Sequence, residues 1–224
     1  MSLLDTIEHE TGSDPRWCVL WLHGLGADGN DFAPIVPDLV RRDWPSIRFV
    51  FPHAPVRAVT INGGARMRAW YDIRDVDLAN RADHEGVAES VAQVDALVAR
   101  EAARGIPPER MLLAGFSQGG AITLAAGIAR AQPLGGLIAL STYLPMGVEQ
   151  ARATLQPAAK TQPVFMGHGV FDPVVPAAGG EAAARALRDF GFEVQWRRYP
   201  MQHSVCAEEI HDLGDWMAAR FAAG

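Results

Sequence analysis

Lysine, cysteine and long apolar runs are all scarce in this sequence. Lys160 is the only lysine, the 19 arginines are scattered, and the formal net charge is −6 with no basic block to offset it. These charges argue against binding to nucleic acid or to anionic lipid. The two cysteines, Cys18 and Cys206, are spaced neither like a disulfide framework nor like a set of metal ligands. We therefore expect both thiols to be reduced and structural.

No run of residues approaches the roughly 18 consecutive apolar residues of a membrane-spanning helix. Residues 1–10 carry acidic side chains and lack the basic and apolar regions of a signal peptide. The sequence thus predicts a cytoplasmic protein with no integral membrane association. A chain of 224 residues, 49% of them hydrophobic, is long enough to bury about 70% of its unfolded surface, and we expect residues 1–224 to form a single domain.

Six short apolar runs are bounded by glycine, proline or charged residues, which is the pattern of strands buried on both faces. These runs are residues 17–22, 47–51, 110–114, 135–140, 163–167 and 193–199. Stretches with helical periodicity separate them, including an apolar stripe from Val87 to Val98, residues 118–131, residues 177–190 and a last helix that contains Trp216. The alternation predicts the α/β class, with a mostly parallel central sheet and helices on both faces.

The segment 52–83 is the one long stretch without clear periodicity. A segment of this kind in a compact protein is usually functional or disordered. Because it contains Trp70 and Tyr71, we expect it to be ordered.

A Gly-x-Ser-x-Gly pattern occupies residues 115–119, with Ser117 as its serine. It lies where an apolar strand meets a helix that begins at Gln118, which is the context that a nucleophile elbow requires. The sharp turn would expose the Ser117 hydroxyl above the sheet, and the helix N-terminus would favour the negative charge that develops during acyl transfer. Ser117 is therefore the candidate nucleophile, and a glycine-rich turn with an N-capping serine is the alternative.

A serine hydroxyl needs a base to remove its proton, and that base needs a carboxylate to fix its tautomer. After a nucleophile elbow, the acid comes first along the chain and the histidine follows. Asp172 lies just after an apolar strand, where ligands bind in open α/β sheets, whereas Asp189 lies near the end of an amphipathic helix. His203 follows the last strand, whereas His211 lies within the last helix and His168 precedes the acid. We predict Asp172 as the acid, His203 as the base and a structural role for His168.

A glycine-rich loop after the first apolar strand has two interpretations. It spells Gly24-x-Gly26-x-x-Gly29, the fingerprint of a nucleotide-binding, Rossmann-type oxidoreductase. That fold needs a helix that begins within the glycines and a carboxylate at the end of the next strand, but Pro34 delays any helix and the strand at 47–51 ends without an acid. In a serine hydrolase, the same loop supplies a backbone N–H for the oxyanion. We favour the second interpretation.

Further segments share the order and spacing of one enzyme family. They are His23-Gly24-Leu25-Gly26, Gly115-Phe116-Ser117-Gln118-Gly119-Gly120, Ser141-Thr142-Tyr143-Leu144-Pro145, His168-Gly169, Asp172-Pro173-Val174-Val175-Pro176 and His203. From about Val19 to the last helix, the chain resembles the carboxylesterase and acyl-protein thioesterase (lysophospholipase-like) family of α/β-hydrolases. The resemblance implies an α/β-hydrolase fold without a lid domain and a triad of Ser117, Asp172 and His203.

The resemblance also implies that the backbone N–H groups of Leu25 and Gln118 form the oxyanion hole. The side chains expected near the acyl group of the substrate are Trp70, Tyr71, Leu144 and Val175. For the two aromatic residues among these, the alternative is that they pin the long loop to the core.

Family members act on esters of short to medium acyl chains, on lysophospholipids or on S-acylated proteins. We therefore expect a small-molecule ester or thioester substrate, and the mechanism needs no metal or organic cofactor. The resemblance also allows a homodimer formed through an apolar surface. A hydrolase-fold binding scaffold that has lost catalysis is a further alternative, but every position of the triad is filled.

Overall fold

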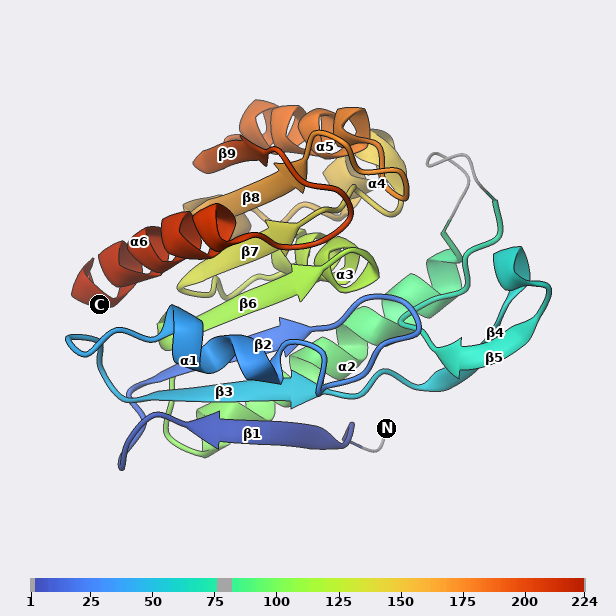
Figure 1. Cartoon of the computed structure of the whole chain (residues 1–224). Coiled ribbons are helices and arrows are strands. Elements are labelled where there is room, and N and C mark those ends of the chain that lie inside the picture. The colour runs from blue at the N-terminus through green and yellow to red at the C-terminus, as the bar shows by residue number, and fades with distance from the viewer. Residues whose placement is uncertain (1–2, 76–81, 224) are drawn as a thin grey trace.

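A computed structural model describes residues 3–75 and 82–223 of the chain. A seven-stranded sheet runs through its middle, with the strand order β1-β3-β2-β6-β7-β8-β9 (Figure 1). The strands are β1 (Thr6–Glu10), β2 (Trp17–Leu22), β3 (Ile47–Pro52), β6 (Met111–Phe116), β7 (Gly136–Leu140), β8 (Val164–Gly169) and β9 (Val194–Tyr199). Strand β1 pairs antiparallel with β3, and all the other pairings in this sheet are parallel.

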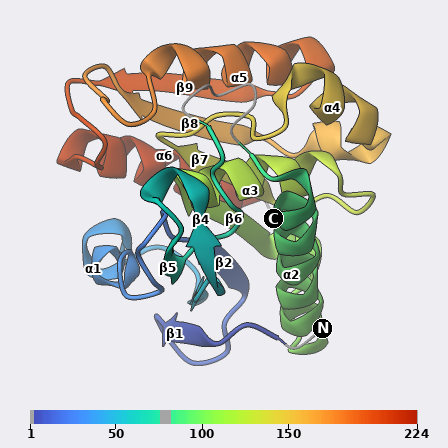
Figure 2. The same ribbon diagram turned by 90° about the vertical axis from the view of Figure 1, so that its right-hand side faces the viewer.

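Helices cover both faces of the sheet, so the predicted α/β architecture is confirmed. They are α1 (Val36–Leu39), α2 (His84–Ala103), α3 (Gln118–Ile128), α4 (Gly147–Thr154), α5 (Ala177–Phe190) and α6 (Ala207–Ala223). Helices α1 and α6 lie on one face, and α2 to α5 lie on the other (Figures 1 and 2). Among the helices in the described part of the chain, none combines the length and the apolar character needed to cross a membrane.

The alternation of side chains along β2 shows how the sheet joins two hydrophobic cores. Cys18, Leu20 and Leu22 point into the core beneath α2 to α5. Trp17, Val19 and Trp21 point into the core beneath α1 and α6. All six side chains are buried, because a central parallel strand has an apolar layer on each side. This is why β2 is a continuous apolar run in the sequence.

The structure adds elements that the sequence patterns did not predict. Strand β1 lies at the edge of the sheet, and its side chains are largely exposed, so it carries no apolar run. Within the segment 52–83, β4 (Val56–Val59) and β5 (Ala65–Arg68) form a separate antiparallel hairpin. Trp70 and Tyr71 are completely buried, so the described part of this segment is ordered as predicted. Residues 76–81 of the segment lie outside the described residues.

Candidate active site

Ser117 occupies a sharp turn between the end of β6 and the start of α3. Its backbone has φ 55° and ψ −117°, which a non-glycine residue rarely adopts. The turn is tight because β2 lies directly beneath the start of the helix. A Cβ atom at Gly119 would lie 2.3 Å from the carbonyl oxygen of Leu22, so this position accepts only glycine. The Gly-x-Ser-x-Gly pattern therefore has the strand-turn-helix context that the sequence predicted.

Side chains that follow β8 and β9 meet Ser117 at this turn. His203 follows β9, and its Nε2 lies 2.9 Å from Oγ of Ser117. Asp172 follows β8, and its Oδ2 lies 2.6 Å from Nδ1 of His203. Because the parallel strands end at one edge of the sheet, residues 86 and 31 positions apart in the chain become hydrogen-bonded neighbours.

The surroundings of Asp172 determine which nitrogen of His203 carries the proton. Oδ1 of Asp172 accepts hydrogen bonds from the N–H groups of Val174 and Val175, each at 2.8 Å. Oδ1 is thus engaged as an acceptor, and Oδ2 is the acceptor that faces the His203 ring. Nδ1–H of His203 therefore donates to Oδ2, and Nε2 faces the Ser117 hydroxyl as an acceptor. This is the tautomer that a general base needs.

His168 is a second imidazole beside Asp172, and it is completely buried. Its Nε2 lies 2.9 Å from the carbonyl oxygen of Val175 and 3.5 Å from Oδ2 of Asp172. Burial lowers the pKa of His168, which keeps the ring neutral. Nε2–H then donates to Val175 and fixes the turn that presents the carboxylate. This position agrees with the structural role predicted for His168.

The loop at residues 23–26 lies directly against the Ser117 turn. A Cβ atom at Gly24 would lie 3.6 Å from Cβ of Ser117. Ala54 N–H donates to Nε2 of His23 at 3.0 Å, while Nδ1 of His23 lies 2.7 Å from the carbonyl oxygen of Gly24. Burial lowers the pKa of His23 to about 4, so the ring is neutral and Nδ1–H is the donor. His23 therefore holds the start of this loop.

The N–H groups of Leu25 and Gln118 are the expected oxyanion donors. In the described part of the chain, neither N–H has a hydrogen-bond partner. Free backbone donors next to a serine hydroxyl are suited to receive negative charge on a substrate oxygen. The same loop does not start a helix: only a short 3-10 turn at Ala33–Ile35 and the four-residue α1 follow it. This geometry disfavours the nucleotide-binding interpretation.

The structure brings Trp70 and Tyr71 to the site but buries both side chains completely. The side chain of Gln118 binds both residues through their backbone: Trp70 N–H donates to Oε1, and Nε2 donates to the carbonyl oxygen of Tyr71, each at 2.8 Å. Nε1–H of Trp70 also donates to the carbonyl oxygen of His23 at 2.9 Å. These contacts fit the alternative in which the aromatic pair pins the long loop. The sequence patterns gave no signal for the Gln118 side-chain contacts.

Leu144 and Val175 lie near the same edge, with 7% and 1% of their surfaces exposed. The turn that carries Asp172 instead exposes Val170, Phe171 and Val174, of which Phe171 is 67% exposed. No pattern in the sequence indicated this apolar rim beside the acid.

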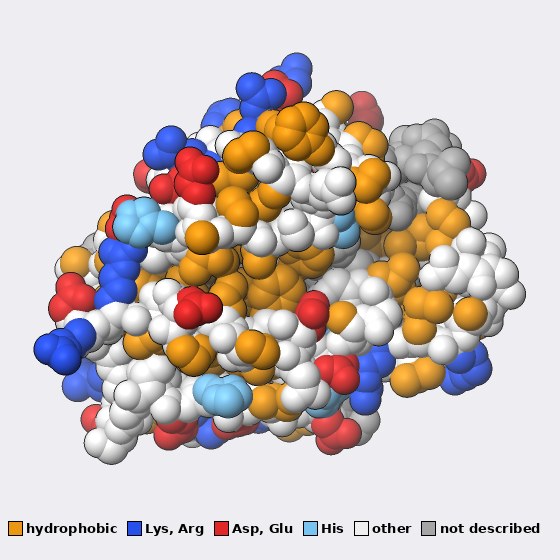
Figure 3. Space-filling model, viewed as in Figure 1, with side chains coloured by type: hydrophobic (Ala, Val, Ile, Leu, Met, Phe, Trp, Pro, Cys, Tyr) orange, Lys and Arg blue, Asp and Glu red, His pale blue; other side chains and the backbone are white. Residues whose placement is uncertain are grey.

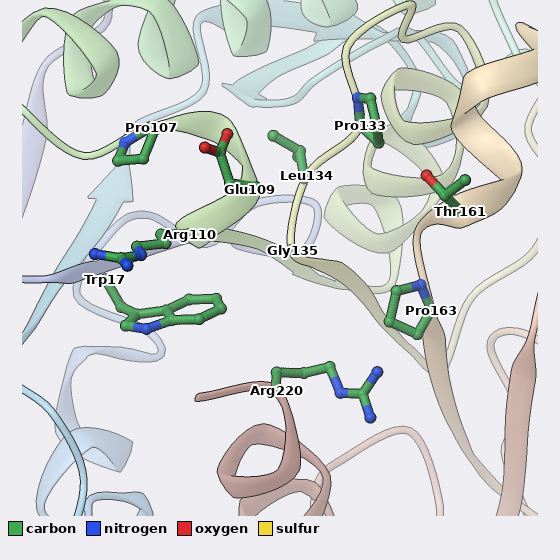
Figure 4. A pocket seen from close by; sticks show the side chains of 10 residues that line it. All are labelled: Trp17, Pro107, Glu109, Arg110, Pro133, Leu134, Gly135, Thr161, Pro163 and Arg220. Carbon is green, nitrogen blue, oxygen red and sulfur yellow. The ribbon is translucent and has the colours of Figure 1, made fainter. Parts of the chain in front are cut away.

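Several cavities lie outside the Ser117 turn, and two of them lie at different places along the sheet. One, of about 490 Å³, lies between α1 and the start of α6, on the face where Figure 3 shows a hollow lined by hydrophobic side chains. The other, of about 690 Å³, lies at the opposite edge of the sheet, where Trp17, Arg110 and Arg220 line it (Figure 4). Neither cavity is lined by Ser117, His203 or Asp172.

Among residues 3–75 and 82–223, no group of three or more His, Cys, Asp or Glu side chains is arranged to hold a metal ion. Cys18 and Cys206 are both free, as expected from their spacing.

The chain is similar to known proteins over most of its length. Residues 7–220 match the family described as Phospholipase/Carboxylesterase. Acyl-protein thioesterase 1 of Gibberella zeae is 39% identical over 203 residues, which cover 87% of this chain and 86% of that protein. Carboxylesterase SOBER1 of Arabidopsis thaliana is 33% identical, over 92% of this chain and 91% of that protein.

Solved structures extend the likeness to the fold. The crystal structure of Arabidopsis thaliana SOBER1 has a TM-score of 0.86 and covers 92% of this chain and 99% of that chain, at 33% identity. That of Zea mays acyl-protein thioesterase 2 has a TM-score of 0.83 and covers 96% and 99%, at 25% identity. With a family match over nearly its whole length, this chain belongs to the phospholipase/carboxylesterase family of α/β-hydrolases.

Proposed function

We propose that this protein is a serine hydrolase that cleaves carboxylic esters or thioesters through Ser117, His203 and Asp172. The hydrogen-bonded line from Ser117 Oγ through the His203 ring to Asp172 Oδ2 is the observation that carries the proposal. Its two bonds have the order and the polarity of a nucleophile, a base and an orienting acid.

The reaction follows from these positions. Nε2 of His203 takes the proton of Ser117 as Oγ attacks the acyl carbon, and Asp172 stabilises the imidazolium that forms. His203 then protonates the leaving alcohol or thiol, which leaves an acyl group on Ser117. A water molecule attacks this acyl-enzyme with His203 again as the base, the bond between the acyl carbon and Oγ breaks, and His203 returns the proton to Oγ as the acid product leaves.

The oxyanion of each tetrahedral intermediate lies between the N–H groups of Leu25 and Gln118. Gln118 is the first residue of α3, so its N–H also lies at the positive end of the helix dipole. His23 and Trp70 support the proposal indirectly, because their bonds keep the Leu25 loop against the Ser117 turn.

We infer that the substrates carry short to medium acyl chains. The relatives named above are acyl-protein thioesterases and carboxylesterases. Leu144 and Val175 are our candidates for direct contact with the acyl group. Trp70 and Tyr71 act on the groove through the loop that they pin, since neither side chain is exposed.

Labelling with a fluorophosphonate tests the proposed function, because only an activated serine reacts rapidly with this probe. We expect rapid labelling of the wild-type protein at Ser117 and none in Ser117→Ala. Ser204, an exposed serine beside His203, provides the matched control: Ser204→Ala should be labelled like the wild type. An unlabelled wild-type protein, or equal labelling of Ser117→Ala, would refute the proposal.

A further inference from the structure

The Ser117 backbone is held by contacts with the end of β7. The N–H of Ser117 donates to the carbonyl oxygen of Leu140 at 2.9 Å. The carbonyl oxygen of Ser117 accepts the first helical bond of α3, from Ala121 N–H at 3.0 Å. It also accepts a bond from the side-chain hydroxyl of Thr142 at 2.7 Å. This last bond comes from a residue 25 positions away, and the proposed reaction does not use it.

The position of Thr142 is closely defined. Its side chain is 1% exposed and lies against the start of α3. A Cβ atom at Gly120 would lie 2.8 Å from Cβ of Thr142, so the glycine makes room for this side chain. The preceding residue, Ser141, has φ 46°, an unusual backbone conformation that turns the chain at the end of β7. The fold therefore holds the Thr142 hydroxyl against one hydrogen-bond partner, the carbonyl oxygen of Ser117.

The carbonyl of Ser117 and the N–H of Gln118 belong to one planar peptide group. A hydrogen bond to the carbonyl therefore fixes the direction in which the Gln118 N–H points. It also polarises the peptide, since hydrogen bonds in a chain strengthen one another by about 10–30%. Thr142 thus acts on the opposite end of the peptide that would donate to the oxyanion.

We propose that Thr142 is a positioning residue for the oxyanion hole: its hydroxyl orients and polarises the peptide between Ser117 and Gln118. The proposal rests on the proposed serine-hydrolase function. In this role the hydroxyl stabilises the transition state and does not affect substrate binding, because the oxyanion exists only after Ser117 attacks.

The test compares Thr142→Val, which keeps the shape and removes the hydroxyl, with Thr142→Ser, which keeps the hydroxyl. Loss of an oxyanion donor itself costs about 10²–10³ in kcat, so loss of its support should cost less, roughly five- to thirtyfold. We expect this loss in Thr142→Val with KM changed less than about twofold. Thr142→Ser should stay within about threefold of the wild type. Active sites are counted by fluorophosphonate titration, so that misfolded protein does not enter kcat.

Thr123 provides a matched control on α3. It is a completely buried threonine whose hydroxyl has no partner within the described residues. Thr123→Val should therefore leave kcat per titrated site unchanged.

A second measurement separates oxyanion stabilisation from a purely structural role. A trifluoromethyl ketone forms a tetrahedral adduct with the serine and places its oxyanion in the hole. In Thr142→Val, its inhibition constant should increase by about the same factor by which kcat/KM falls. The pH dependence of kcat should stay that of the wild type. If Thr142 had only a structural role, Thr142→Val would have a lower melting temperature. Its inhibition constant and its kcat/KM per active site would then be those of the wild type.

Two outcomes would overturn this proposal: a wild-type kcat per titrated site in Thr142→Val, or a Thr142→Ser variant as impaired as Thr142→Val. Failure of the proposed function looks different, because Ser117→Ala would then remain active or the wild type would escape labelling.

Discussion

The two edges of the parallel sheet contrast sharply. At the amino edge, the starts of the strands surround a cavity of about 690 Å³ that includes Trp17 and two arginines (Figure 4). At the carboxyl edge, Ser117, His203 and Asp172 form a directed hydrogen-bonded line. The amino edge has the cavity, whereas the carboxyl edge has polar side chains whose donors and acceptors are held in place by hydrogen bonds. Oriented polar groups, rather than the volume of a cavity, therefore mark the edge where we propose that the reaction takes place.

Backbone strain supports the same distinction. Among the described non-glycine residues, Ser117, Ser141 and Asp14 have positive φ. The first two end β6 and β7 at the carboxyl edge, while Asp14 lies in an exposed turn before β2. Both strained carboxyl-edge residues are buried, so packing maintains conformations that cost about 1–3 kcal/mol each.

The largest effect on turnover is expected when the nucleophile is removed. Ser117→Ala should lower kcat by roughly 10⁴-fold or more, because binding and the oxyanion hole alone would remain. Arg220→Ala, at the amino-edge cavity, should stay within about twofold of the wild type. Ester hydrolysis and circular dichroism measure activity and folding of both variants. A Ser117→Ala variant with a tenth of wild-type turnover, or an equally inactive Arg220→Ala, would remove the contrast between the edges.

The next effect concerns the acid. Asp172→Asn should lower kcat by about 10³–10⁴-fold, because the amide favours the wrong tautomer of His203. Asp189→Asn is the control: this exposed residue near the end of α5 should give nearly wild-type turnover. Steady-state kinetics on one ester measure both. The reverse ranking of the two variants would show that the acid is misplaced.

A third prediction concerns the free energy of unfolding, and it depends on a buried glutamate near the carboxyl edge of the sheet. Glu209 of α6 is completely buried, and burial, with a further contribution from Asp212, raises its pKa to about 8. An unfolded chain would ionise this group near its ordinary value of 4.5. Stability from Glu209 is therefore complete below pH 4.5 and is lost as the pH rises through 8, by about 5 kcal/mol in total.

Glu209→Gln removes this titration. The free energy of unfolding is measured with urea at pH 5 and at pH 9. From pH 5 to pH 9 it should fall by about 4 kcal/mol more in the wild type than in the variant. Glu208→Gln, an exposed neighbour, is the control and should follow the wild type. An identical pH dependence for Glu209→Gln and the wild type would contradict the prediction.

The smallest effect concerns acyl chain length. Each acyl methylene buried at the carboxyl edge should raise kcat/KM about fourfold, from about 0.8 kcal/mol, until the groove ends. Leu144→Ala should flatten this series if Leu144 contacts the acyl chain. Esters of graded length, measured both below and above their solubility limits, and an S-acylated peptide test the point. A steep rate increase only above the solubility limit would indicate a lid, and an unchanged series in Leu144→Ala would place the groove elsewhere.

Much of the fold was predictable because its central strands are buried on both faces. The run from Trp17 to Leu22 is apolar at every position, and the structure begins and ends β2 at these residues. Strand β1 was not predictable in this way, since an edge strand with exposed side chains has no continuous apolar pattern. The hairpin of β4 and β5 was missed for the same reason: most of its side chains are exposed or half-buried.

The strand-turn-helix context of Ser117 and the order of serine, acid and histidine could be predicted from the sequence, because they depend on local patterns and on the shared direction of parallel strands. The long-range contacts that support them could be identified only in the folded structure. The bond from Thr142 to the Ser117 carbonyl and the clamp of Gln118 on Trp70 join residues 25 and 48 positions apart. Such contacts depend on how the ends of different strands pack together, which no periodicity along the chain records.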